Sequence, residues 1–528
     1  MSRSSTNGSQ VLEEEAIVVV PGRVNEKPAA EGILPTVRRH LLSVFPFQVV
    51  LATIVIVVVF ALARRGMNDP DIWWHMRNAQ YLLTQHQLPR FDMFSWTVAG
   101  HPWINHEWLS EVPFYLGWRA VGIVGVKSVS LVVIMAIFLC LLYLCNKVSG
   151  NFKASVAACS ACIFLATVNF GPRTILFGYL NLLVLLIVLE RFRRLGHAPL
   201  WIIPPLFALW VNTHGSWLLG MIIFSITIAG GLIQGNWGCI TSERWSLTQF
   251  GKLMLTWMAS VAALFVNPFG WHLVFYPFDL AFRQKLNISH VAEWVSVDFH
   301  DLRGKIVLGF IIFLLVSVLI RRRKWTLTEL LLLLFGLYSG LTYMRFLFLF
   351  GILAAPVIAK MLDFFPPYRR ELDTPIVNTL VVCGLIAAMV FFWPTSAELQ
   401  QSVDADYPAG VVSYLKTYPA EGPMLTFYLW GGYLGWQDNN VKVFVDSRVD
   451  IFEYAGVLKD YLDVLSVQTA APVLEKYKIQ YVLFPKNEPL TYMLQRDPAW
   501  RVLYSDQVSV LLEKTDNKSV PAVAGGGR

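Results

Sequence analysis

The sequence is poor in charged residues. Asp, Glu, Lys and Arg make up 15% of the 528 residues, while hydrophobic residues make up 55%. A soluble globular protein carries about 25% charged residues. The shortage of charge excludes a soluble protein for most of the chain and indicates that most of it lies in lipid.

The sequence also lacks a disulfide framework, a signal peptide and a basic nucleic-acid-binding patch. Five of the six cysteines lie in apolar runs and no disulfide framework is visible; the Cys159-x-x-Cys162 pair indicates close helix packing rather than redox chemistry. The first forty residues lack the pattern of a signal peptide, and residues 1–43 are predicted to form a disordered cytoplasmic tail. No basic patch with interleaved aromatic residues occurs, so the net charge of +7 does not predict a nucleic-acid partner.

Long apolar runs are what the sequence has in abundance. A membrane-spanning helix needs roughly 17–25 predominantly apolar residues. Runs near this length lie at about 44–63, 120–145, 154–170, 174–192, 199–212, 216–234, 252–267, 305–320, 327–343, 345–362 and 376–394. With a cytoplasmic N-terminus, Lys and Arg fall in every cytoplasmic loop, as the positive-inside rule requires. We therefore predict a polytopic α-helical membrane domain of about eleven spans over residues 44–395.

An odd number of spans places three long segments on the external face. They are the loops 64–112 and 268–304 and the segment after the last span. Residues 396–515 have the composition of a soluble domain and alternate between helical and strand-like runs, which predicts a small external α/β domain. The strand-like runs lie at 424–429, 441–445, 479–484 and 508–514, and the helical runs at 409–418 and 455–478. Residues 516–528 are predicted to be a disordered tail.

The first external loop carries the densest set of reactive side chains. Between residues 68 and 111 it holds the D-x-D pair Asp69 and Asp71, four histidines and five tryptophans. Apolar residues recur at helical spacing after Asp71, which predicts an interfacial helix with Asp71 at its N-terminus, where free backbone amides favour a carboxylate. The pair could act as a general base or hold a divalent cation; the alternative is a helix cap with solvated charge.

Three histidine and acidic positions in this loop are additional candidates. His75 lies one helical turn after Asp71 and could hydrogen-bond that carboxylate or a phosphate. His106 and Glu107, at the end of the loop, could provide a second acid or base or metal ligands, and interfacial polarity is the alternative. The four histidines do not show the spacing of a zinc site.

Charged residues outside this loop complete the candidate set. Glu293 lies in the second external loop. Arg345 lies between two apolar runs, where an unpaired arginine is costly, and its guanidinium suits a phosphate. Arg173 is a similar case. His214 and Asn267, near span ends, are interpreted as polar core residues.

Several segments resemble, in the same order, the catalytic subunits of oligosaccharyltransferases. The run DIWWHMR, which begins at Asp71, resembles the D-x-aromatic-aromatic-[NH]-x-R segment of their first external loop. The run SHVAEW is similar to a later loop with a catalytic acidic residue, which corresponds to Glu293. Arg345, followed by FLFL and AAP, resembles the arginine that meets the lipid-linked phosphate, and Trp430 stands where that family has W-W-D-Y-G. The resemblance implies the GT-C superfamily of polyprenyl-phosphate-dependent glycosyltransferases.

Two departures separate the chain from that family. Glycine at 431 or 432 replaces the aspartate of W-W-D, so the resemblance does not carry over recognition of an Asn sequon. After Arg173, the run GYLN at 178–181 replaces a second acidic pair, so a full metal site is not implied. The chain is also similar to the single-sugar branch of the superfamily, which includes protein mannosyltransferases and the aminoarabinose transferases of lipid A. That likeness implies a first-loop aspartate that acts without an obligate metal.

The implied reaction transfers a sugar from a polyprenyl-phosphate-linked donor, by a single inverting displacement, to a protein, lipid or glycan acceptor on the external face. Asp71 would deprotonate or orient the acceptor, with Asp69 or Glu293 assisting. A divalent cation, Mg²⁺ or Mn²⁺, would be held by Asp71 and Glu293 if one is used.

The implied binding residues surround these carboxylates. Arg345, His75 and Arg173 would bind the phosphate and lipid of the donor, and Trp430 would contact the acceptor. The expected location is the bacterial inner membrane, with the C-terminal domain periplasmic. Two other classes stay open: a catalytically inactive GT-C-like scaffold or assembly factor, which the missing acidic pair favours, and a transporter. A transporter predicts inverted repeats and acidic residues near span centres, and the sequence shows no such repeat.

Overall fold

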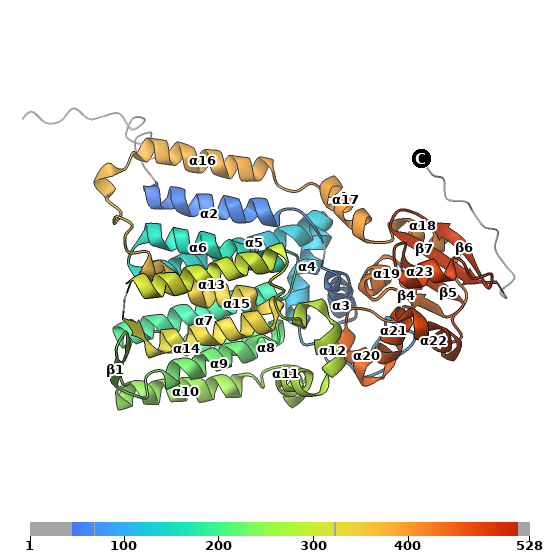
Figure 1. Ribbon diagram of the computed structural model, residues 1–528, viewed down its shortest axis with the longest axis horizontal. Coiled ribbons are helices and arrows are strands. Elements are labelled where there is room, and N and C mark those ends of the chain that lie inside the picture. The colour runs from blue at the N-terminus through green and yellow to red at the C-terminus, as the bar shows by residue number, and fades with distance from the viewer. Residues whose placement is uncertain (1–44, 68, 322–323, 516–528) are drawn as a thin grey trace, which may run out of the picture.

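The computed structural model describes residues 45–67, 69–321 and 324–515. A bundle of helices forms one part of the molecule and a compact α/β unit forms the other, with the helices α3, α4, α11 and α12 between them (Figure 1). The predicted tails, residues 1–43 and 516–528, lie outside the described residues.

Every apolar run predicted from the sequence lies in a helix of the bundle. These helices are α2 (Phe47–Ala63), α5 (Ile123–Ser149), α6 (Phe152–Ala166), α7 (Ile175–Leu195), α8 (Ile203–Thr213), α9 (Trp217–Ala229), α10 (Leu247–Ala263), α13 (Leu302–Arg321), α14 (Leu327–Thr342), α15 (Leu347–Met361) and α16 (Pro375–Phe391). Within the described residues, five helical segments are long and apolar enough to cross a membrane, or six if the bent pair α16 and α17 (Ser396–Asp406) is one span. The chain is an integral membrane protein, and the count of about eleven spans stays a prediction.

Helix α15 lies at the centre of the bundle and contacts α5, α6 and α14. It is apolar on all sides, as expected for a helix with no solvated face. Cys162 of α6 packs against it, with its thiol donating to the carbonyl of Gly351 at 3.2 Å, and Cys159 lies 4.0 Å from Cys145 between sulfur atoms. These contacts confirm that the cysteines of the C-x-x-C pair are packing residues.

The predicted interfacial helix is α3 (Asp71–Gln85), with Asp71 as its first residue. Its buried face includes Ile72, Met76 and Ala79, the apolar residues at helical spacing. The helix packs against α4 (Trp108–Val121) and against α19 (Gly431–Gln437) of the α/β unit. Helix α3 thereby joins the two parts of the molecule (Figure 1).

The α/β unit contains a four-stranded sheet in the order β4-β5-β7-β6. Strand β4 (Met424–Thr426) is parallel to β5 (Tyr481–Pro485), while β7 (Ser509–Lys514) is antiparallel to β5 and to β6 (Trp500–Ser505). The surrounding helices are α18 (Ala409–Thr417), α19, α20 (Val449–Tyr454), α21 (Val457–Leu465), α22 (Ala470–Lys476) and α23 (Pro489–Leu494). Three of the four predicted strands are present.

The fourth predicted strand, residues 441–445, is wrong, and the sequence pattern does not predict β6. Residues 441–445 run alongside the first external loop: Val443 forms an isolated bridge with Ser95, and the Thr97 hydroxyl donates to the carbonyl of Phe444 at 2.6 Å. The apolar pattern of this segment therefore reflects contact with the loop rather than with the sheet. The remaining elements are α11 (Trp271–Arg283), α12 (Lys285–His290) and the short strands β1 (Gly235–Trp237), β2 (Ile240–Ser242) and β3 (Trp325–Thr326).

Candidate functional site

A small polar pocket lies beside the N-terminus of α3, where the helical bundle meets the α/β unit. It has a volume of about 40 Å³. Its lining residues come from six separate stretches of the chain: Asp69, Asp71, His75, Glu107, Asn169, Arg173, Thr174, Ile175, His214, Glu293 and Arg345. All of the sequence-predicted site residues except His106 and Trp430 line this pocket, which we call the acidic pocket.

Asp69 and Asp71 are held by a tight local turn. The backbone N–H of Asp71 donates to Oδ1 of Asp69 at 2.8 Å, and the indole N–H of Trp74 donates to Oδ1 of Asp71 at 3.2 Å. The same indole lies 3.1 Å from the hydroxyl of Ser447 in the α/β unit. Burial, together with the negative charge of Asp69, raises the pKa of Asp71 to about 7. At neutral pH this carboxyl can therefore accept a proton.

Arg173 ties two of the other carboxylates together. Its Nε donates to Asp69 and its Nη2 donates to Glu293. Burial alone would raise the pKa of Glu293, but the charges of Arg173 and Arg345 outweigh it and lower that pKa. Among the described residues, Asp71 has no comparable ion pair, so it is the carboxylate of the pocket that is left for a proton-transfer role.

A divalent cation does not fit between these carboxylates as they are arranged. The guanidinium of Arg173 already donates to Asp69 and Glu293. The carboxylate oxygens that a metal ion would need as ligands are therefore bound to Arg173. Within the described part of the chain, no group of three or more His, Cys, Asp and Glu side chains is placed to hold a metal ion. With Arg173 in place, Asp71 and Glu293 are not arranged as ligands of one ion, and the dependence of the reaction on a metal stays a prediction.

Arg345 approaches the pocket from a break in the helical bundle. A short 3₁₀ turn, Met344–Phe346, separates α14 from α15, at the break expected from the sequence. The guanidinium carbon of Arg345 lies 4.3 Å from the ring centroid of Trp294, and the Tyr179 hydroxyl donates to the Arg345 carbonyl at 3.1 Å. Its buried Nε atom has no hydrogen-bond partner among the described residues. A buried donor without a partner is costly, which favours a site for an anion at this position.

His75 connects the pocket to a buried network of carboxylates. Its Nδ1 lies 3.0 Å from Oε1 of Glu111, and its Nε2 lies 3.3 Å from Oε2 of Glu107. Burial alone would lower the pKa of His75, but the hydrogen bond to Glu111 and the charge of Glu107 raise it. Because both ring nitrogens face carboxylates, His75 holds α3 against α4 and has no ring nitrogen free for a phosphate.

Glu107 is the centre of this network. Its Oε1 lies 3.2 Å from Nε2 of His214 and 3.5 Å from Nε2 of His106. Burial would raise the pKa of Glu107, but the neighbouring imidazoles lower it. His106 lies behind the pocket, where its ring stacks on Tyr276 at 4.5 Å between centroids. Glu107 is thus an ionised acceptor that positions three imidazoles.

Two residues of this arrangement are absent from the sequence-based candidates. His214, interpreted as a polar core residue, lines the pocket and contacts Glu107. Glu111 is buried and accepts from Asn78 and Asn105 as well as facing His75. The sequence could have indicated Glu111 by its position, because it is a carboxylate one helical turn after Glu107, in the first turn of α4. For His214, the signal is its position at the predicted external end of an apolar run.

Trp430 does not reach the acidic pocket. It is 3% exposed, and its indole N–H donates to the carbonyl of Asp406 at 2.9 Å. The two glycines after it explain the missing aspartate of this segment. A Cβ on Gly432 would lie 3.0 Å from the Pro70 carbonyl, and a Cβ on Gly431 would lie 2.5 Å from the Cβ of Asp446. Here glycine permits α19 to press against α3, and Trp430 is a packing residue.

The chain combines a helical bundle, an α/β unit that packs on α3 and a polar pocket between them. The apo structure of ArnT from Cupriavidus metallidurans is similar to this chain, with a TM-score of 0.50 and 12% identity over 88% of this chain and 97% of ArnT. This likeness confirms the resemblance at the level of the fold.

Other solved structures match at lower similarity. ArnT from the same organism bound to undecaprenyl phosphate gives a TM-score of 0.49 and 12% identity over 90% of this chain and 98% of ArnT. The Archaeoglobus fulgidus oligosaccharyltransferase tethered with an acceptor peptide gives 0.48 and 13% over 82% of this chain and 69% of that protein. No family model and no curated protein matches the sequence.

Proposed function

We propose that the chain is a membrane glycosyltransferase that moves a sugar from a polyprenyl-phosphate-linked donor to an acceptor. The observation that carries the proposal is the pairing, in one buried pocket, of a proton-accepting carboxylate with an arginine that has an unpartnered donor. These are Asp71 and Arg345. Proton removal from an acceptor and charge neutralisation on a leaving phosphate need these two functions in one place.

The proposed reaction is a single displacement at the anomeric carbon. The acceptor heteroatom attacks that carbon while its proton passes to the carboxylate of Asp71. The bond between the anomeric carbon and the phosphate oxygen breaks, and polyprenyl phosphate leaves with the electron pair. Arg345 neutralises the charge on the leaving phosphate. Asp69 and Glu293 act indirectly, since Arg173 binds both and fixes the turn that carries Asp71.

The proposed orientation follows the distribution of Lys and Arg along the chain. The N-terminus lies in the cytoplasm, and the acidic pocket and the α/β unit lie on the external face of a bacterial inner membrane. A donor held by its lipid would enter from the bundle side of the pocket, and a protein, lipid or glycan acceptor from the side of the α/β unit. Trp430 is left out of the proposed acceptor contacts because it is buried.

A second candidate function is a GT-C-like scaffold without activity. The volume of the acidic pocket favours it, because about 40 Å³ is too small for a sugar ring unless side chains move. The double ion pair of Arg173 also keeps two carboxylates away from a substrate.

Release of polyprenyl phosphate distinguishes the two functions. Purified full-length protein is incubated with a polyprenyl-phosphate-linked sugar and a membrane extract that supplies acceptors, and the free lipid phosphate is measured over time. Multiple turnovers, with an inverted anomeric configuration in the product by NMR, support the transferase. Tight donor binding without release supports the scaffold. If the protein neither binds the donor nor releases polyprenyl phosphate, the proposed donor is contradicted.

A further inference from the structure

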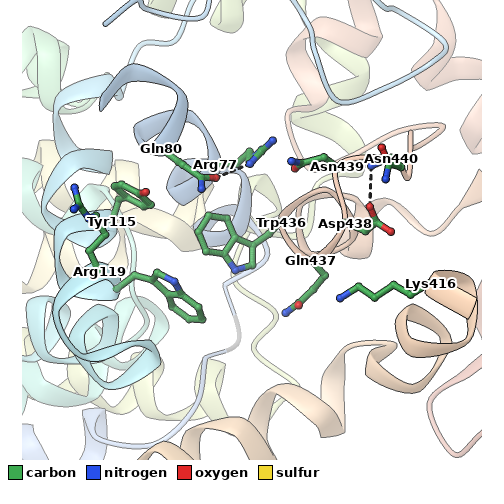
Figure 2. Close-up of a pocket in the computed structure, with 11 residues that line it drawn as sticks. Arg77, Gln80, Tyr115, Arg119, Lys416, Trp436, Gln437, Asp438, Asn439 and Asn440 are labelled. Atoms are coloured by element: carbon green, nitrogen blue, oxygen red, sulfur yellow. Dashed lines mark hydrogen bonds between the residues drawn. The ribbon is translucent and has the colours of Figure 1, made fainter. Parts of the chain in front are cut away.

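A second and much larger pocket lies beside α3, where α4 and the segment after α19 meet (Figure 2). Its volume is about 670 Å³, within the range of about 300–1,000 Å³ that is typical of small-molecule sites. The residues that line it are Arg77, Gln80, Tyr115, Trp118, Arg119, Lys416, Trp436, Gln437, Asp438, Asn439 and Asn440. It shares no lining residue with the acidic pocket, and we call it the α3–α19 pocket.

The charge of the α3–α19 pocket is positive. Arg77, Arg119 and Lys416 contribute three cations, against a single carboxylate from Asp438. That carboxylate is used locally, because its Oδ1 accepts the backbone N–H of Asn440 at 2.9 Å. Among the described residues, no carboxylate lies within ion-pair distance, 4.0 Å, of the three cations. Uncompensated cations in a concave site attract an anion.

Aromatic rings form the centre of this pocket. The ring of Trp436 lies edge-on to those of Tyr115 and Trp118, with centroid distances of 6.4 Å and 5.3 Å and nearly perpendicular planes. Figure 2 shows Trp436 beside Tyr115 in the pocket. Trp436 is only partly buried, so part of its indole faces the cavity. The face of an aromatic ring carries partial negative charge and attracts the polarised C–H groups of a sugar ring.

Amide side chains supply the remaining polar groups. Gln437, Asn439 and Asn440 each offer a carbonyl acceptor and an NH₂ donor, whereas the Gln80 carbonyl already accepts from Nη1 of Arg77 at 2.5 Å and leaves its NH₂ group as a donor. Hydroxyl groups both donate and accept, so amides of this kind match the edge of a carbohydrate. Cations, aromatic faces and amides together fit a hydroxylated ring that also carries a negative charge.

The surface next to the pocket is apolar. Leu116 and Val121 of α4 flank Arg119 in sequence and are 49% and 63% exposed. In a membrane protein, such side chains on the surface of an otherwise packed helix lie against lipid. A ligand in the α3–α19 pocket can therefore be the headgroup of a lipid as well as a free sugar.

We propose that the α3–α19 pocket binds an anionic carbohydrate, a sugar that carries a carboxylate or a phosphate, free or as the headgroup of a glycolipid. Arg119 and Lys416 bind the anion, Trp436 contacts the face of the ring, and the amides bind the hydroxyl groups. The binding does not depend on the proposed transfer reaction, because the two pockets have separate lining residues.

The test is a binding titration of the full-length protein. Calorimetry in neutral detergent compares tri-galacturonate and glucose 1-phosphate with neutral maltotriose and with inorganic phosphate. Nanodiscs then compare glucuronosyl diacylglycerol with neutral galactosyl diacylglycerol and with phosphatidylglycerol, which separates a lipid-borne sugar from a free sugar and from a phospholipid. Two doubly substituted variants are titrated alongside, Arg119→Ala/Lys416→Ala and, as the matched control, Lys459→Ala/Lys486→Ala, which removes two exposed cations elsewhere on the α/β unit.

The expected result is saturable binding of at least one anionic carbohydrate, weakened tenfold or more by Arg119→Ala/Lys416→Ala and unchanged by the control. Thermal unfolding of each variant checks that both remain folded. The proposal is overturned if no anionic carbohydrate binds, if the pocket variant binds as tightly as the wild type, or if maltotriose binds equally well. Equal affinity for phosphatidylglycerol and glucuronosyl diacylglycerol also overturns it, because the site would then recognise only a lipid anion.

Discussion

Arg173 and Glu293, which are 120 residues apart in the sequence, form an ion pair inside the acidic pocket. The other edge of the same guanidinium binds Asp69, next to the turn that carries Asp71. Residues from the first external loop, from the turn just before α7 and from the second external loop are thereby held at one point. The position of Asp71 depends on this cation.

We predict that Arg173→Met destabilises the protein by about 3 kcal/mol, since it leaves two partly buried carboxylates without a counter-ion. Adding Glu293→Gln to this variant should restore part of the loss, because it removes one of the orphaned charges. The measurement is the thermal unfolding of purified protein in detergent. The matched control is Arg283→Met, at an arginine 77% exposed in a surface ion pair with Asp279, where we expect little change. Equal effects of the two arginine substitutions would contradict this account of Arg173.

Removing Arg173 should also change the response of the pocket to metal ions. In Arg173→Met, the carboxylates of Asp69, Asp71 and Glu293 lack the guanidinium that separates them, and carboxylate oxygens are suitable ligands for Mn²⁺. We expect Mn²⁺ binding, followed by electron paramagnetic resonance, in Arg173→Met and weaker or no binding at this pocket in the wild type. Adding Asp69→Asn should abolish the new binding. Equal Mn²⁺ binding by wild type and Arg173→Met at this site would show that the guanidinium does not replace a cation.

The unpartnered donor of Arg345 predicts a role in binding the leaving phosphate. Arg345→Met should lower turnover about a hundredfold, equivalent to about 2.7 kcal/mol of barrier. Arg345→Lys keeps the charge but loses the planar fork, so its loss should be smaller. The measurement is kcat and KM for the lipid-linked donor. Arg283→Met, at an arginine 77% exposed on α11, serves as the control and should keep wild-type values. Full activity in Arg345→Met would remove Arg345 from the proposed mechanism.

The network around Glu107 predicts a pH-dependent contribution to stability. The pKa of Glu107 is lower in the folded protein than in the unfolded chain, where it is near 4.3. Its ionised carboxylate therefore stabilises the fold fully above about pH 4.3, and this stabilisation is lost as the pH falls through the folded-state pKa. The pKa values of His75 and His106 are raised in the folded protein. Their charged rings therefore stabilise the fold fully below about pH 6.5, and this stabilisation is lost as the pH rises through the folded-state pKa values. We therefore expect the difference in melting temperature between wild type and Glu107→Gln to be largest between about pH 4.5 and 6.5 and to shrink toward pH 9.

The control for this series is Asp404→Asn, at an exposed carboxylate of α17. Its difference from the wild type should stay small and nearly constant across the same pH range. A Glu107→Gln difference that grows toward pH 9 would have the wrong sign for charged imidazoles at His75 and His106 beside an ionised Glu107. His214, whose pKa burial lowers to about 3, stays neutral throughout this range.

The helices and most of the acidic pocket are predictable from the sequence because both depend on local patterns. Apolar runs of fixed length predict the bundle helices, and the spacing behind Asp71 predicts α3. The positive-inside rule predicts which end of each span is external, and so which polar residues share one face of the membrane. That assignment places Asp71, Glu293 and Arg345 on the same face, and all three line the acidic pocket.

The failures come from contacts between distant segments. The segment 441–445 has the composition of a strand, but its partner is the first external loop, and nothing in the local pattern distinguishes the two. The two ion pairs of Arg173 and the role of His214 likewise depend on which side chains meet across the pocket. The family resemblance assigns Trp430 to an acceptor, whereas the glycines after it show that the segment packs against α3.

The most direct test of the central claim is the effect of Asp71→Asn on release of polyprenyl phosphate from a lipid-linked sugar by the purified protein. With Asp71 as the base and its pKa raised to about 7, wild-type kcat should rise with pH up to about 7 and then level off, since only the ionised carboxylate accepts the proton. Asp71→Asn should lower the rate at least a hundredfold, about 2.7 kcal/mol of barrier, while donor binding and the melting temperature stay near wild type. Equal release by Asp71→Asn and wild type would contradict the account, because the proposed proton acceptor would then be dispensable.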